Sequence, residues 1–166
     1  MLRDSSRCLL VFFLLLLTTS CGFALRGSQL TTQTTVSTQS DEHGSPLLFL
    51  LNRRLDERGV LREIGQGDWH VHLERPDWQT RLLSLEGAQR NQLIRLVLHY
   101  RVTDRGDKTP FGRRRFEQER VLSVDDNLLT GAQSRTEDLQ KSILRNAVEQ
   151  IVADIYLATA SSAQPR

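Results

Sequence analysis

The chain has 166 residues, of which 25% are charged, and its formal net charge at pH 7 is only +2. A balance so close to neutral produces no strong field that would attract nucleic acid. The length fits one domain, and only two cysteines are present, Cys8 and Cys21. A mature chain that starts at Cys21 therefore forms no internal disulfide, and its fold must depend on a hydrophobic core.

The first twenty residues have the layout of a secretory signal peptide. Arg3 and Arg7 form a basic region, an uninterrupted apolar run follows over residues 8–17, and small residues come next. The run has about ten residues, whereas a membrane-spanning helix needs roughly 20, so a permanent transmembrane anchor is the weaker interpretation. Residues 1–20 are expected to be removed, which lowers the net charge from +2 to about +1.

Cys21 directly follows the small residues Thr19 and Ser20. This arrangement resembles the lipobox of bacterial lipoproteins, although Thr18 stands where that family usually has Leu. The resemblance implies that Cys21 becomes the mature amino terminus and carries acyl chains, each buried methylene of which contributes about 0.8 kcal/mol to membrane attachment. The alternative is cleavage elsewhere, which would leave Cys21 as a free thiol. Gly22 follows where inner-membrane retention would usually show Asp, which implies the outer membrane.

The first two elements of the mature chain are predicted from short patterns. The polar tract 28–40 reads as a linker by composition, but its alternating β-branched residues favour a strand near residues 32–38. A helix should follow, with Ser45 as its N-cap, Pro46 at its first position and Gly59 at its end. Its apolar face should consist of Leu47, Leu48, Leu51 and Leu55.

Alternating apolar and polar residues predict three further strands, and the charges of the last one favour an edge position or polar surroundings. Pro76 interrupts the first of these, so the residues after it are interpreted as the same strand continuing past a bulge or kink. The expected segments are residues 69–74 continued by 78–85, residues 94–102 and residues 113–124, with turns at 86–89 and 104–106.

A long helix is predicted at the end of the chain. Ser134 and Glu137 fit a capping box at its start. An apolar stripe recurs every fourth residue, which predicts a face packed on the sheet. The small and polar residues 160–166 are expected to form a disordered tail. The stripe consists of Leu139, Ile143, Ala147, Ile151 and Ile155, widened by Leu144, Val148 and Val152.

The element order β-α-β-β-β-α predicts an α+β two-layer sandwich: a mixed four-stranded sheet with two helices on one face. The first strand returns through a helix, so it should run parallel to the second through a right-handed crossover, and hairpins should join the later strands. The expected organisation is a signal peptide over residues 1–20, one domain over residues 21–159 and the tail.

No motif for catalysis is present, since the chain lacks a nucleophile elbow and a phosphate-binding glycine loop. His70, His72 and His99 together with Glu74 offer a set of zinc ligands, but such spacing is common by chance and a solvated sheet face is the preferred interpretation. We therefore expect no enzymatic activity, no cofactor and no metal site.

The densest basic run is Arg113, Arg114 and Arg115, close to Phe111. Arginine donates paired hydrogen bonds to phosphate, so this run could hold a phosphate-bearing amphiphile. The preferred alternative is a solvated edge whose charges discourage the addition of another strand.

The segment CGFALRG over residues 21–27 resembles the mature amino terminus of the lipopolysaccharide-assembly lipoprotein family LptE. The likeness continues through residues 44–47, the helix that ends near Gly59 and the terminal helix after residues 126–127. It implies the fold predicted above and a plug inside the β-barrel of the LptD translocon. It also implies assistance in barrel assembly, binding of lipopolysaccharide, and a lipid anchor on the periplasmic side of the outer membrane.

The resemblance also implies two ligand-binding positions. Family members carry an arginine at the turn between the second and third strands and a lysine just before the last helix. Here Glu86 and Gly87 occupy the turn, so Arg90 is the nearest base, and Arg135 is the nearest counterpart before the helix. The predicted topology places these two arginines at one end of the sheet and Arg113 at the other. The alternative function is a free-standing outer-membrane lipoprotein that binds or shields an amphiphile in the periplasm.

Overall fold

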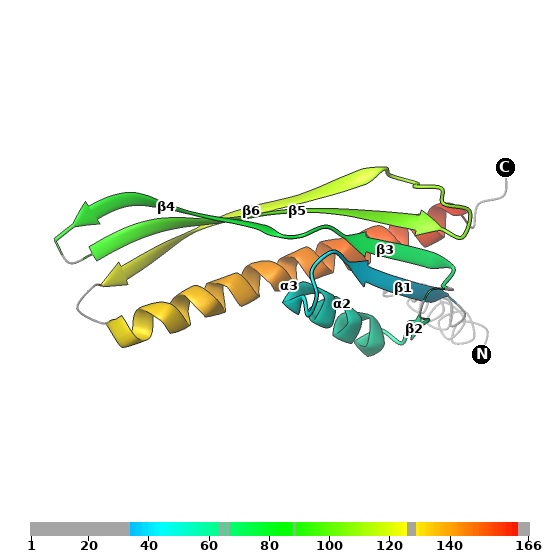
Figure 1. Cartoon of the computed structure of the whole chain (residues 1–166), viewed down its shortest axis with the longest axis horizontal. Helices are drawn as coiled ribbons and strands as arrows, with labels where there is room; N and C mark the ends of the chain where they lie inside the picture. The colour runs from blue at the N-terminus through cyan, green and yellow to red at the C-terminus, as the bar shows by residue number, and fades with distance from the viewer. Residues whose placement is uncertain (1–33, 64, 66, 88, 126–128, 163–166) are drawn as a thin grey trace, which may run out of the picture.

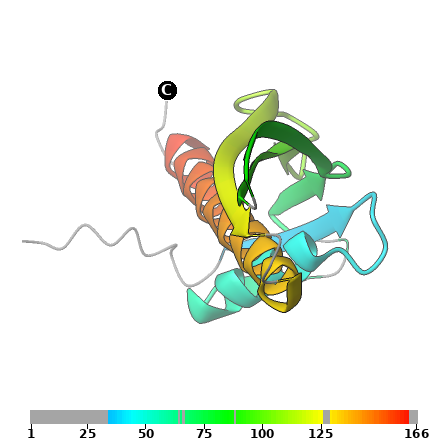
Figure 2. The same cartoon turned by 90° about the vertical axis from the view of Figure 1, so that its left-hand side faces the viewer.

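The computed structural model describes residues 34–63, 65, 67–87, 89–125 and 129–162. They form an α+β fold with two helices and a curled, mixed sheet (Figures 1 and 2). The sheet has six strands in this part of the chain, so the prediction of four was wrong. In chain order the elements are β1 (Thr35–Ser40), α2 (Pro46–Glu57), β2 (Leu61–Arg62), β3 (Trp69–Leu73), β4 (Asp77–Glu86), β5 (Gln89–Asp104), β6 (Arg113–Asp125) and α3 (Leu129–Ser162).

The sheet is organised around β5, its longest strand. Strands β3 and β4 both pair antiparallel with β5 along one edge, with Leu73 opposite Tyr100 and Trp78 opposite Leu96. Strand β6 pairs antiparallel with the other edge. The prediction that Pro76 interrupts one continuing strand is therefore confirmed, because β3 and β4 are successive segments that pair along the same edge of β5. They count as two strands since proline cannot donate a ladder hydrogen bond.

The remaining strands extend the sheet beyond β3. Strand β1 pairs parallel with β3, as the helical crossover predicted. Strand β2 pairs parallel with the start of β1 and was not predicted. It has only two residues, Leu61 and Arg62, which are too few to produce an alternating pattern.

Helix α2 lies where the sequence predicted it. Ser45 occupies the N-cap position and Pro46 the first turn, but the Ser45 hydroxyl makes no capping hydrogen bond. At the other end, Gly59 adopts a φ of 71°, a backbone conformation that favours glycine and that terminates the helix. The buried face consists of Leu47, Leu51 and Leu55.

Helix α3 is longer than predicted at both ends. It begins at Leu129 and continues to Ser162, so Ser134 lies inside the helix and the predicted capping box is wrong. Inside the helix, Glu137 instead accepts a hydrogen bond of 3.1 Å from the Gln133 side chain, one helical turn earlier. The first residues of the expected tail are also helical.

Side chains from one face of the sheet and from both helices meet in a single hydrophobic core. We call this the inner face of the sheet and the opposite one the outer face. The predicted alternation in β5 is confirmed, and the stripe of α3 is buried apart from Leu139, which is only partly covered. The fully buried residues include Val36, Leu73, Ile94, Leu96, Leu98, Tyr100, Ile143, Ile151 and Ile155.

Candidate functional site

Three chain segments meet at one end of the molecule, which we call the distal end: the β4–β5 turn, the last residues of β6 and the first turns of α3 (Figure 1). Arg90 lies just after the turn, and Arg135 lies early in α3. Arg113 pairs with Arg101, far along β5 toward the opposite, proximal end. The structure therefore places Arg90 and Arg135 at the same end, as the predicted topology required. Their role in binding stays a prediction.

Arg90 lies on the inner face of the sheet. It is opposite Leu85 of β4 and Val124 of β6. Arg90 is four residues from the core residue Ile94 on the same strand, and residues an even number of positions apart point to the same face. The side chain is half-buried. Arg135, in contrast, is exposed on α3. It does not precede the helix, as the family resemblance implied, but belongs to it.

Two leucines next to Arg90 are exposed although they lie on the inner face. Leu82 is opposite Gln92 and Leu85 is opposite Arg90, and a register shift between Leu82 and Ser84 keeps both on this face. Their side chains are 55% and 62% exposed, because the helices do not cover this part of β4. The distal end thus combines uncovered apolar surface with arginine, a chemistry that suits an amphiphile bearing phosphate groups.

Sequence reasoning did not identify these leucines as surface residues. The signal was present, since Leu82, Leu83 and Leu85 interrupt the alternation of apolar and polar residues. Three leucines in four positions of a strand cannot all face one core.

At the proximal end, the structure separates the three arginines of the basic run. Arg113 and Arg115 lie on the outer face, whereas Arg114 lies on the inner face opposite Tyr100. Each is paired with a carboxylate: Arg113 with Glu74, Arg114 with Asp154 and Arg115 with Glu117. The run therefore does not form one phosphate-binding cluster.

The Arg113 guanidinium binds Glu74 with an Nε–Oε1 distance of 2.7 Å. Its hydrogen bonds hold the pKa of Glu74 below the usual range of a glutamate. The Glu74 carboxylate is thus engaged by arginine. His72 contacts Asp41 with an Nε2–Oδ1 distance of 2.9 Å. In the part of the chain that the structure describes, no group of three or more His, Cys, Asp or Glu residues is placed to bind a metal ion.

Arg114 belongs to a buried polar network that the sequence did not predict. Its Nε and Nη2 atoms lie 3.0 and 3.2 Å from the two carboxylate oxygens of Asp154, which also accepts a hydrogen bond of 2.5 Å from the Tyr100 hydroxyl. Burial, together with the Asp154 charge, raises the pKa of Tyr100 to about 12. The guanidinium also lies 5.6 Å from the centre of the Phe111 ring. Asp154 was detectable in principle as the one charge within the apolar stripe of α3.

Cys21 and the expected signal peptide lie outside the described residues, so cleavage and lipidation stay predictions. Within the described ranges, no helix combines the length and the hydropathy needed to cross a bilayer.

Comparisons with known proteins point to one family and one fold. The model of the family described as LptE, lipopolysaccharide-assembly, matches residues 29–155. Rare lipoprotein B from Shewanella oneidensis superposes with a TM-score of 0.66 at 17% identity, covering 78% of this chain and 99% of that one. An uncharacterized lipoprotein B from Nitrosomonas europaea also gives 0.66, at 20% identity over 84% and 93% of the two chains.

A minor lipoprotein from Acinetobacter baumannii gives a TM-score of 0.62 at 16% identity, over 78% of this chain and 97% of that one. Identities this low establish the shared fold alone. No curated protein sequence matches this chain significantly.

Proposed function

This chain belongs to the LptE family of lipopolysaccharide-assembly proteins, and from that premise we propose that it is a plug and assembly partner of an LptD-like β-barrel. In this role it binds lipopolysaccharide during transport to the cell surface, while acyl chains on Cys21 hold it at the periplasmic side of the outer membrane. The role is one of assembly and transport, without catalysis. The family match over residues 29–155 is the observation that carries the proposal.

The chemistry of the distal end supports lipopolysaccharide as the ligand. Lipopolysaccharide joins clustered phosphates to acyl chains, so a site for it needs cationic donors beside apolar surface. Arg90 and Arg135 supply guanidinium donors, and Leu82 and Leu85 supply the apolar surface. Each exposed charge should contribute on the order of 1 kcal/mol, and salt should weaken it.

The polar character of the outer face supports the plug. Pairs such as Arg113 with Glu74 and Arg115 with Glu117 cover this side of the sheet with charge. The interior of a barrel wide enough to hold a domain is polar and hydrated, so a plug must present such hydrogen-bonding groups to it. A domain with an apolar outer face would be poorly suited to that environment.

Co-purification from detergent-solubilised membranes tests the proposal. The full chain, carrying an affinity tag after residue 166, should bring down one large outer-membrane β-barrel in a constant ratio after extensive washing. A matched preparation from cells that express the same tag on an unrelated lipoprotein controls for non-specific binding of barrels to the tag or the resin. Recovery of the chain alone, under conditions where lipopolysaccharide still binds to it, would instead support the free-standing amphiphile carrier.

A further inference from the structure

Helices α2 and α3 form a surface groove that the proposed plug role does not use. One section of it has a volume of about 650 Å³, and its walls are mainly apolar. The apolar side chains come from Pro46, Leu48, Phe49 and Leu50 of α2 and from Leu144 of α3. Sites for small organic ligands have volumes of roughly 300–1,000 Å³, so this section can accommodate a ligand of the size of one acyl chain.

Phe49 is the feature of the groove that the fold does not explain. It lies on α2 one residue from Leu48 and Leu50, which pack against the core, yet its own side chain is 68% exposed. An aromatic ring contributes substantial free energy when it is removed from water, so an occupant that covers Phe49 would be bound favourably.

The charged residues that line this section are both basic. Lys141 and Arg145 project from α3, one helical turn apart, and no acidic residue lines the section with them. Lys141 has only a long contact of 3.8 Å with Asp138, on the exposed surface. Arg145 has no carboxylate within ion-pair distance among the described residues. The groove is thus complementary to a ligand that is apolar at one end and anionic at the other.

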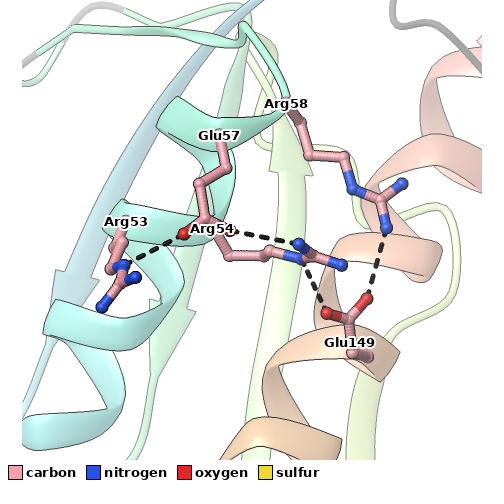
Figure 3. A network of polar contacts seen from close by, with 5 residues as sticks. All are labelled: Arg53, Arg54, Glu57, Arg58 and Glu149. Atoms are coloured by element: carbon pink, nitrogen blue, oxygen red, sulfur yellow. Dashed lines mark hydrogen bonds and ion pairs between the residues drawn. The ribbon is translucent and has the colours of Figure 1, made fainter.

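The groove continues past Arg145 into a second, smaller section of about 310 Å³, where α2 and α3 are joined by the ion pairs in Figure 3. Glu149 lies 2.6 Å from the Arg54 side chain and 3.3 Å from that of Arg58. Glu57 likewise contacts Arg53 and Arg54. Because each glutamate is held by two arginines, neither carboxylate presents an uncompensated negative charge that would repel an anion at Arg145.

We propose that the α2–α3 groove binds one acyl chain of an anionic phospholipid. The chain lies on Leu48, Phe49 and Leu144, and the phosphate contacts Arg145 and Lys141. The observation that favours a phospholipid is that two cations flank a single apolar section, which suits one of its acyl chains together with its anionic head. This site lies along α2 and does not include Arg90 or Leu85, so it is separate from the distal end and does not depend on the barrel partner.

Photocrosslinking in vesicles of defined composition tests the proposal. The full chain, with p-benzoylphenylalanine in place of Phe49, is reconstituted into vesicles of phosphatidylglycerol or of phosphatidylcholine and irradiated, and adducts are quantified by mass spectrometry. The same crosslinker in place of Leu157, an exposed residue of α3 outside the groove, measures random contact with the bilayer. We expect phosphatidylglycerol adducts at position 49 well above those at position 157, and few phosphatidylcholine adducts.

Charge reversal then tests the head-group contact. Lys141→Glu with Arg145→Glu should reduce the phosphatidylglycerol adducts about five-fold, since each exposed charge has a modest effect. The matched control is Lys108→Glu with Arg75→Glu, two exposed cations outside the groove, which should leave the yield unchanged. Equal yields from both lipids, insensitivity to the groove reversal, or adducts with a second copy of the chain would each overturn the proposal.

Discussion

Arg114 of β6 and Asp154 of α3 form a two-point ion pair across 40 positions of sequence, with Nε–Oδ2 and Nη2–Oδ1 distances of 3.0 and 3.2 Å. Asp154 is only 4% exposed, so its charge depends on Arg114 and on the Tyr100 hydroxyl for compensation. The pair joins an edge strand to the helix that covers the core. Loss of this contact should destabilise the fold.

Replacement of Arg114 by alanine should therefore lower the free energy of unfolding by about 1–3 kcal/mol, because it leaves a buried carboxylate without its cation. Arg115→Ala is the matched control, since Arg115 pairs with Glu117 on the exposed outer face and should change stability by less than about 0.5 kcal/mol. Urea unfolding of the two variants measures the difference. If both variants lose the same free energy of unfolding, the buried pair contributes no more to stability than the exposed one.

Ile143 is fully buried in the stripe of α3 that packs on the sheet. Ile143→Ala should cost about 2–5 kcal/mol, through lost burial and the cavity that remains. Leu157→Ala, on the same helix but 57% exposed, should cost less than about 0.5 kcal/mol. Thermal melts of both variants provide the comparison, and an unchanged melting temperature for Ile143→Ala would contradict the packing described here.

The Glu74–Arg113 pair should make stability depend on acid pH. Arg113 depresses the pKa of Glu74 below its ordinary value of 4.5, so the folded state holds this proton less tightly than the unfolded state does. The stabilisation is present above about pH 4.5 and is lost as the pH falls through the lower, folded pKa. When the pH is lowered from about 5 to about 3, the melting temperature of the wild type should therefore fall further than that of Glu74→Gln. Parallel pH profiles for the two proteins would contradict this.

Binding of lipopolysaccharide should depend on arginines at the distal end. Arg90→Glu with Arg135→Glu should weaken binding, each charge contributing on the order of 1 kcal/mol and less as salt is added. Arg113→Glu should have a much smaller effect, because Arg113 lies at the proximal end and is paired with Glu74. Titration at low and moderate salt, with melting temperatures recorded to confirm folding, measures this. If Arg113→Glu weakens lipopolysaccharide binding more than the double substitution does, the run Arg113–Arg115 is the better candidate for the binding site.

Cys21→Ala should give an unlipidated or unprocessed precursor, because the acyl chains would have no thiol to which they could be attached. Mass spectrometry of the wild-type amino terminus should find lipid on Cys21, and the variant should shift from the membrane fraction when membranes are washed. An unmodified cysteine at the wild-type amino terminus would overturn the assignment.

Elements with strong periodicity were predictable from the sequence. The alternation in β5 and the recurrence of Ile143, Ile151 and Ile155 in α3 reflect burial directly, so the core follows from them. The start of α3 was not predictable from Ser134, since a serine followed three residues later by glutamate also occurs inside helices. Strand β2 depends on its pairing with β1, and no local pattern of two residues encodes such a contact.

The candidate sites were predictable to a lesser extent. Topology was sufficient to place Arg90 and Arg135 at one end, because hairpins reverse direction in a known way. The interrupted alternation indicates that some of the leucines of β4 lie on the surface, but the exposure of Leu82 and Leu85 on the inner face depends on where the helices leave the sheet uncovered. The groove beside Phe49 likewise arises only when two helices distant in sequence lie side by side.

The surroundings of β5 change along its length. Around Tyr100 the strand is covered by the core, whereas near Arg90 it faces the exposed Leu82 and Leu85. The free energy of local opening follows buried apolar contact, so backbone amides at the beginning of β5 should exchange with deuterium much faster than those around Tyr100. One continuous strand thus passes from a part held by the core to a distal part that we expect to open locally. We expect this distal part to adjust to a ligand without unfolding of the rest of the molecule.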